Sequence, residues 1–239
     1  YRKSVGLGVT SKSLGDTMPG PIAVADVDQD GDLDVFVGGR AVTGHYPQAS
    51  VSSLFLASGR GLDRTESALS NPLGIVNGAV FSDLDTDGYP ELIVATEWGA
   101  VRVFKNLEGR FDEMTEAVGL SGLTGLWQGV ATGDFNGDGL TDIVATNWGL
   151  NSSLRPDVLN PPRLYFNYSE SSVPTSLMLG VWDDASSAYL PTQDLFSIFK
   201  GYPQLRGVFQ THRAFASSVH RGCPARCRPF PGCSPSSPQ

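Results

Sequence analysis

The sequence lacks several features that assign a chain to common protein classes. No apolar run approaches the roughly 18 residues of a membrane-spanning helix, so no transmembrane segment is expected. There are only 3 histidines, and His45 alone precedes the region expected to be helical. The 3 cysteines all lie in the last 17 residues, and an odd number cannot pair completely. These shortages argue against a membrane-spanning helix and a histidine-based catalytic centre, and the cysteines do not identify the redox compartment.

Basic charge is also scarce. The chain has 17 Lys and Arg against 25 Asp and Glu, which gives a formal net charge of −8. Nucleic-acid binding is disfavoured, because it needs a basic face. The acidity is local, since 12 of the 25 acidic residues fall in three short loops. Three bound Ca²⁺ ions would leave a charge of about −2, so the acidity indicates metal sites rather than a general attraction to basic partners.

The three acidic loops, nine residues each, organise the chain: loop one is 26–34, loop two is 83–91 and loop three is 134–142. Each has an acid or amide at positions 1, 3 and 5, a Gly at position 6 and a carboxylate at position 9. So many carboxylates repel one another unless a cation neutralises them, and Ca²⁺ accepts about six to eight oxygens. The Gly permits the positive φ that a turn around an ion needs. Position 7 varies, as expected if only its backbone carbonyl binds. The predicted ligands of about three Ca²⁺ sites are Asp26, Asp28, Asp30, Asp32, Asp34, Asp83, Asp85, Asp87, Tyr89, Glu91, Asp134, Asn136, Asp138, Leu140 and Asp142.

The loops differ from an EF-hand on their C-terminal side. An EF-hand has a bidentate Glu at position 12, where these loops have Val37, Val94 and Ala145. Those residues belong to short, β-branched apolar runs that are typical of buried strands. Each loop is also preceded by a strand-like stretch, so the repeated unit is strand, calcium loop, strand. The alternative is an acidic β-turn that binds no metal.

The repeat spacing predicts the fold. The loops start 57 and then 51 residues apart, and a period near 50 with four strands per unit is typical of a β-propeller. We therefore expect an all-β fold, a partial β-propeller of about three to four four-stranded blades, with a small C-terminal helical segment. The expected strands are near 20–26, 33–38, 51–57 and 61–66, then 78–83, 91–96, 100–106 and 110–115, then 128–134, 142–146 and 163–167.

These units resemble the FG-GAP/VCBS repeat, the calcium-loop blade of integrin-α-like β-propellers. Over roughly residues 1–215 the closer resemblance is to bacterial relatives of cartilage acidic protein. It is carried by the loops and by the segments 104–106, 109–111, 115–120 and 145–151. The rings of that family are expected to need about seven blades. The resemblance therefore implies that this chain is a fragment, with calcium in a structural role.

The pattern changes after residue 168. The resemblance leads us to expect a fourth acidic loop there, and the sequence has none, so no fourth metal site is assigned. We expect blades over 1–190 and a helical insertion over 191–219 with Thr192 as its N-cap. The Pro- and Cys-rich tail over 220–239 is expected to be disordered or aberrant. A zinc site in the tail is disfavoured, because its cysteine spacing matches no usual pattern.

The function expected from these features is non-enzymatic. The paired carboxylates all belong to the loops, and no Ser/His/Asp or Cys/His arrangement can be argued. We expect a calcium-binding module for adhesion or protein interaction at the cell exterior, where calcium is abundant, in a secreted protein whose leader is not seen in this chain. The alternative is a polysaccharide-binding lectin or calcium-dependent lyase that uses Trp98, Trp127 and Trp148 as stacking surfaces. The partner is accordingly a protein or a glycan.

Overall fold

The structure of the chain is a computed structural model, which describes residues 17–58, 61–65, 67–149, 152, 154, 159–166, 177–185, 187–201, 203–207 and 211. The chain divides into two compact units, Tyr1–Trp148 and Gly149–Gln239. The described segments are nearly all β, with several antiparallel sheets of which none closes, and one short α-helix. No helix in them is long and apolar enough to cross a membrane.

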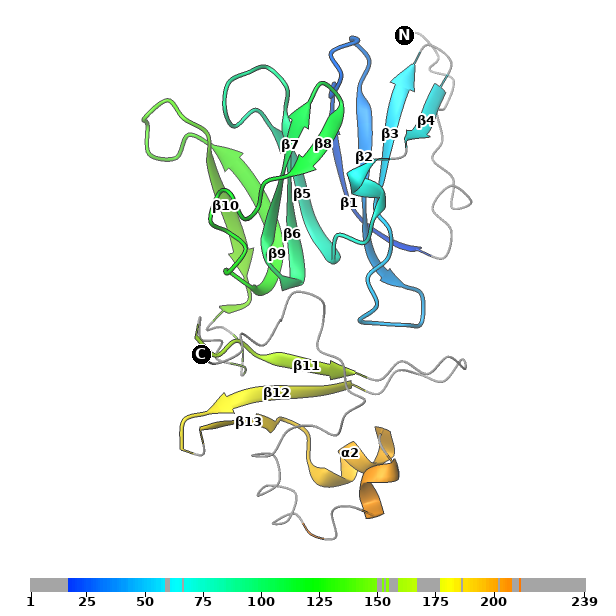
Figure 1. Cartoon of the computed structure of the whole chain (residues 1–239), viewed down its shortest axis with the longest axis vertical. Coiled ribbons are helices and arrows are strands. Elements are labelled where there is room, and N and C mark those ends of the chain that lie inside the picture. The colour runs from blue at the N-terminus through cyan, green and yellow to red at the C-terminus, as the bar shows by residue number, and fades with distance from the viewer. Residues whose placement is uncertain are drawn as a thin grey trace. The chain divides into compact units, whose positions relative to one another are not determined.

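Two meander sheets and a hairpin lie side by side in the first unit (Figure 1). The first sheet contains β1 (Thr17–Ala25), β2 (Asp34–Val42), β3 (Ser53–Ser58) and β4 (Gly61–Thr65). After the 3₁₀ turn η1 (Ala68–Ser70), the second sheet contains β5 (Ile75–Ser82), β6 (Glu91–Gly99), β7 (Val101–Leu107) and β8 (Arg110–Glu113). The hairpin contains β9 (Gly125–Gly133) and β10 (Asp142–Asn147). These strands agree with the predicted ones to within a few residues.

The three acidic loops close their hairpins in the same register. The residue just before each loop pairs with the carboxylate at position 9, in the pairs Ala25 with Asp34, Ser82 with Glu91 and Gly133 with Asp142. Because the registers match and the hairpins lie side by side, the loops lie at one edge of the unit, uppermost in Figure 1.

The apolar core lies between neighbouring sheets. Phe36 of the first sheet meets Phe81 of the second edge to face, with ring centroids 6.5 Å apart. Along β6, Val94 packs toward the first sheet, whereas Ile93 packs with Val130 of the hairpin. Successive residues of a strand point to opposite faces, so the second sheet is buried on both faces.

The first strands of the two sheets and of the hairpin, β1, β5 and β9, approach each other at glycines. A Cβ on Gly78 of β5 would lie only 2.8 Å from the Cα of Gly129 on β9, and one on Gly20 of β1 would lie 2.7 Å from the carbonyl oxygen of Val76. Backbone atoms cannot move away as a flexible side chain would, so only glycine allows this spacing. The glycines therefore let the sheets stand side by side.

Two pairings differ from the expected blade pattern. β6 also pairs with β9 between Glu97 and Leu126, so the second sheet and the hairpin form one hydrogen-bonded sheet. The segment predicted as the third strand of the third blade is a strand, β11 (Arg163–Phe166), but it pairs with β12 (Leu177–Asp183) instead of β10. The partner segment 177–183 was not expected to be a strand.

The second unit contains a three-stranded sheet in the order β11-β12-β13 (β13, Ala188–Pro191), the helix α2 (Leu195–Gly201) and the 3₁₀ turn η3 (Pro203–Gly207). The N-cap of α2 is Asp194 and not the predicted Thr192, since the carboxylate of Asp194 accepts hydrogen bonds from the backbone N and Oγ of Ser197 at 3.0 and 2.7 Å. The predicted boundary at residue 190 stays a prediction, and the tail 220–239 lies outside the described residues.

Candidate metal centre

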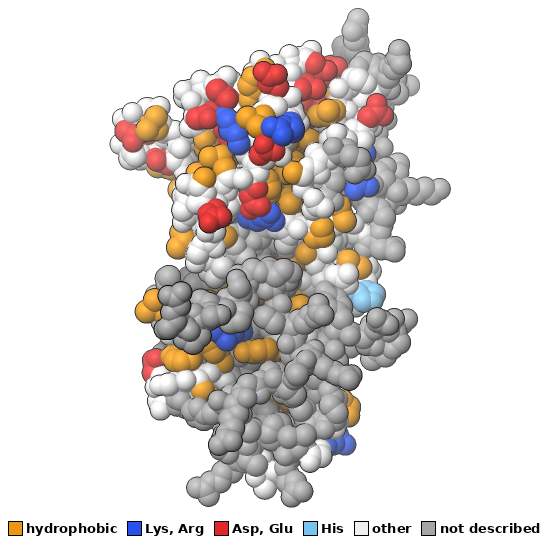
Figure 2. Space-filling view, in the orientation of Figure 1, with side chains coloured by type: hydrophobic (Ala, Val, Ile, Leu, Met, Phe, Trp, Pro, Cys, Tyr) orange, Lys and Arg blue, Asp and Glu red, His pale blue; other side chains and the backbone are white. Residues whose placement is uncertain are grey.

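The three loops share one set of hydrogen bonds. The carboxylate at position 1 accepts from the amide of the position-6 glycine at 2.9–3.0 Å in every loop. The carboxylate at position 9 accepts from the amide at position 2 at 2.8–3.0 Å. The position-6 glycines Gly31, Gly88 and Gly139 have φ of 93°, 92° and 84°, as predicted. The loops are therefore repeated structures as well as repeated sequences, and acidic side chains gather at their edge of the molecule (Figure 2).

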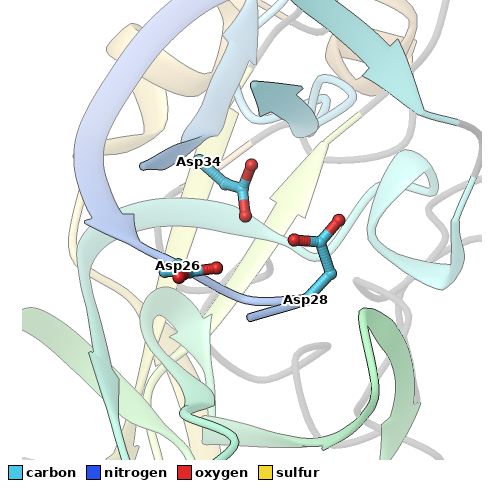
Figure 3. Close-up of side chains that lie close together, drawn as sticks. All are labelled: Asp26, Asp28 and Asp34. Carbon is cyan, nitrogen blue, oxygen red and sulfur yellow. The ribbon is translucent and has the colours of Figure 1, made fainter. Parts of the chain in front are cut away.

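Loop one brings three carboxylates together. Asp26, Asp28 and Asp34 face a common space (Figure 3), and one oxygen of each lies within 4.8 Å of the others. Asp34 is fully buried and accepts hydrogen bonds from the amides of Val27 and Ala57 at 2.9 and 2.7 Å. Burial raises the pKa of Asp34 although both amides lower it. In the described segments no Lys or Arg forms an ion pair with these carboxylates. Their mutual repulsion and burial would be relieved by a bound cation.

Loop two forms a second cluster. One oxygen each of Asp83, Asp85 and Glu91 lies within 4.8 Å of the others, and Glu91 is buried. The Oδ1 atom of Asp83 is buried and has no hydrogen-bond partner among the described residues. An orphaned buried acceptor beside other carboxylates fits a hard cation with oxygen ligands, such as Ca²⁺.

A lysine from a neighbouring strand already contacts this cluster. The Nζ of Lys105, on β7, lies 2.6 Å from Asp85 Oδ2, 2.6 Å from Asp87 Oδ2 and 2.9 Å from Glu91 Oε1. Burial alone would lower the pKa of Lys105, but the three carboxylates outweigh it and raise the pKa. In turn, the Lys105 ammonium lowers the pKa of Asp87. The pKa shifts of Lys105 and Asp87 therefore both favour the charged forms of this ion pair.

Loop three is more open. The amide of Gly139, with those of Gly137 and Asp138, holds the pKa of Asp134 below its usual range. The side-chain amide of Asn136 donates to Asp138 Oδ2 at 3.1 Å, which turns a donor toward the carboxylates. The described acidic side chains form no three-carboxylate cluster in this loop. Its ligand set stays a prediction.

The remaining predicted ligands lie outside the two clusters. Asp30 and Asp32 are exposed, and Asp30 Oδ1 accepts the amide of Asp32 at 2.9 Å. Asp87 Oδ1 similarly accepts the amide of Tyr89 at 2.8 Å, and the Leu140 side chain is 61% exposed. The roles of these residues as metal ligands stay predictions.

Sequence reasoning missed the residues that connect loops one and two. The side-chain amide of Gln29 donates to the carbonyl of Gly88 at 3.0 Å, and that of Asn106 donates to the carbonyl of Val27 at 2.9 Å. Lys105 was also missed as a contact of loop two. The only signal in the sequence is the segment Phe104-Lys105-Asn106, which carries part of the family resemblance. The strand register is what brings it to the loops.

A polar cluster of Tyr46, Glu97 and Trp98 connects the first and second sheets at the ends of β2 and β6 that are far from the acidic loops. The Tyr46 hydroxyl donates to Glu97 Oε1 at 2.6 Å and accepts from Trp98 Nε1 at 2.7 Å. Burial, and then Glu97, raises the pKa of Tyr46. Trp98 adopts a φ of 64°. Since the hydroxyl and the indole N–H pair with each other, this cluster has a structural explanation.

The other two predicted stacking tryptophans differ in exposure. Trp127 is half-buried, and its Nε1 donates to the carbonyl of Leu123 at 3.0 Å. The Trp148 side chain is 54% exposed. Only Trp148 therefore has a large exposed ring among the three.

The comparisons with known proteins agree with the repeated loops. No curated protein matches the chain at a significant level. The model of the FG-GAP-like repeat matches residues 83–145, from the first residue of loop two to the third residue after loop three. The chain thus contains an FG-GAP-like repeat that includes loops two and three and the strands between them.

Proposed function

We propose that the chain is part of a calcium-binding β-propeller that serves protein interaction or adhesion outside the cell and has no catalytic role. The observation that carries this proposal is the repeated carboxylate loop, built with the same hydrogen bonds and the same register at one edge of adjacent sheets. The FG-GAP-like repeat supports it, because such repeats suggest a propeller-like interaction module and often bind calcium.

Calcium would be held by the carboxylate clusters. In loop one the ligands are Asp26, Asp28 and Asp34, and in loop two they include Asp83 and Glu91. Their oxygens would replace water around the ion, and the ion would neutralise charges that otherwise repel. Calcium then clamps the turn between two strands of each sheet, which is a structural role.

The non-enzymatic part of the proposal rests on how the polar groups are used. The clustered carboxylates belong to the loops, and Tyr46, Glu97 and Trp98 satisfy one another. His45 is exposed, with Nδ1 3.0 Å from the carbonyl oxygen of Thr43. The extracellular location rests on the abundance of calcium there and on the FG-GAP-like repeat. The closer relationship to bacterial relatives of cartilage acidic protein stays a prediction.

The test is calorimetric titration of the chain with CaCl₂. Heat of binding is expected, and Asp28→Asn should weaken the loop-one site by about tenfold or more, since the ligand charge count sets the affinity. Asp63→Asn is the matched control, because it also removes one charge but lies on β4, outside every loop. The absence of binding heat in the unmodified chain would contradict the proposal.

The exposed ring of Trp148 keeps one alternative open, namely polysaccharide binding. The side chain could stack on a sugar ring, as tryptophan faces do. A glycan array discriminates between the two functions, and we expect no selective glycan binding. Selective binding that Trp148→Ala abolishes would favour the alternative. Phe196→Ala is the control, because it removes an exposed aromatic ring of the second unit and should leave such binding intact.

A further inference from the structure

The cation that neutralises loop two in the structure is part of the chain. A lysine ammonium has three N–H donors and no acceptor. Lys105 lies within hydrogen-bonding distance of three different carboxylates, at positions 3, 5 and 9 of loop two. All three of its donors therefore have charged acceptors, and hydrogen bonds between charged groups are the strongest in proteins. The Lys105 side chain is 20% exposed and that of Glu91 is 1% exposed, so solvent screens this contact only partly.

Among the described residues no lysine contacts loop one in this way, and the strand registers show why. In the second sheet, Leu92 on β6 pairs with Phe104 on β7, and Lys105 follows Phe104. In the first sheet, Val35 occupies the place of Leu92 and pairs with Phe55, so the equivalent of Lys105 is Leu56. An apolar side chain cannot neutralise the carboxylates. The two loops thus share a backbone pattern but differ in the residue that the third strand of each sheet places beside them, Leu56 for loop one and Lys105 for loop two.

The lysine leaves part of loop two unsatisfied. Asp83 Oδ1, at position 1, is buried without a partner in the described part of the chain, and Lys105 has no further hydrogen to offer it. Ca²⁺ could take this oxygen together with those that Lys105 now contacts, because it carries two charges and accepts more ligands than an ammonium. Calcium and Lys105 would therefore compete for the same oxygens.

We propose that Lys105 acts as a tethered counter-ion that calcium must displace from loop two, so that loop one fills at lower calcium concentrations and loop two at higher ones. This inference rests on the proposed calcium binding. Loop two would keep its structure without calcium, since three of its four carboxylates contact the Lys105 ammonium. Loop one has no such support within the described segments.

Calorimetric titration of the full chain with CaCl₂ tests the competition. Lys105→Met keeps the apolar stem and removes the charge, and it should tighten calcium binding at one site by about tenfold, within the usual range for coupled binding events. Adding Asp85→Asn should abolish that tightening, which assigns it to loop two. Lys200→Met, which removes an exposed lysine of α2, should bind calcium like the unmodified chain. Lys105→Gln, which lacks the charge but can donate hydrogen bonds, should resemble Lys105→Met.

Thermal melting in chelator gives an independent measurement. Lys105→Met should melt at a lower temperature than both the unmodified chain and Lys200→Met, and it should gain more from added calcium. If loop one binds calcium but both Lys105 variants show unchanged affinities and melting, the competition is overturned and the proposed function stands. If no variant gives binding heat, the proposed function fails, and the competition fails with it.

Discussion

Calcium is expected to raise the melting temperature of this chain by several degrees relative to chelator. A ligand that binds only the folded state at about 100 times its Kd stabilises that state by about 2.7 kcal/mol for each site. One kcal/mol shifts the melting temperature by about 2–4 °C for a chain of this size. Even a single filled loop should therefore give a shift of about 5–10 °C. Differential scanning calorimetry measures it in chelator and in about 10 mM CaCl₂, which is about 100 times the Kd of a tight extracellular calcium module.

Two variants connect the shift to the loops. Asp28→Asn removes a charge from the loop-one cluster, whereas Asp63→Asn removes one from exposed β4. The calcium-dependent shift should shrink in the first variant and persist in the second. Equal shifts in both variants would mean that calcium acts elsewhere on the chain.

The second large effect expected is self-association through the first sheet. On β1, Ala23 packs toward the second sheet, whereas Ile22 and Val24 point the other way and are 64% and 51% exposed. Counting back from the loops, Val24 is equivalent to Phe81 of β5, whose ring packs against the preceding sheet. The exposed pair therefore occupies positions that face a preceding sheet in a repeat. Adjacent exposed apolar residues of this kind favour association.

Multi-angle light scattering over a range of concentrations tests this expectation. The chain should form dimers or larger species, and replacing Ile22 and Val24 together by Thr should shift it toward the monomer. Leu123→Thr is the control, since Leu123 is 46% exposed but lies outside the sheets. A compact monomer at high concentration would show that this face is covered or does not associate.

The sequence predicted the loops and strands of the first unit well, because their signals are local. The spacing of Asp26, Asp34 and Gly31 determines the turn, and short β-branched runs determine the flanking strands. Contacts that depend on strand register were missed, above all the one between Lys105 and loop two. The strand β12 that pairs with β11 was also missed, because it lies beyond the point at which the repeat pattern ends.

The position of the matched repeat bears on how such chains could grow by duplication. Residues 83–145 begin inside the second sheet, after β5, and end inside β10, so the repeat does not coincide with any one sheet. It does contain nearly all of the apolar cluster between the second sheet and the hairpin, from Ile93 and Val103 to Ile143. Copying this segment would copy the apolar contact between the second sheet and the hairpin, with residues from both partners. A duplicated repeat would thus bring most of this packing with it.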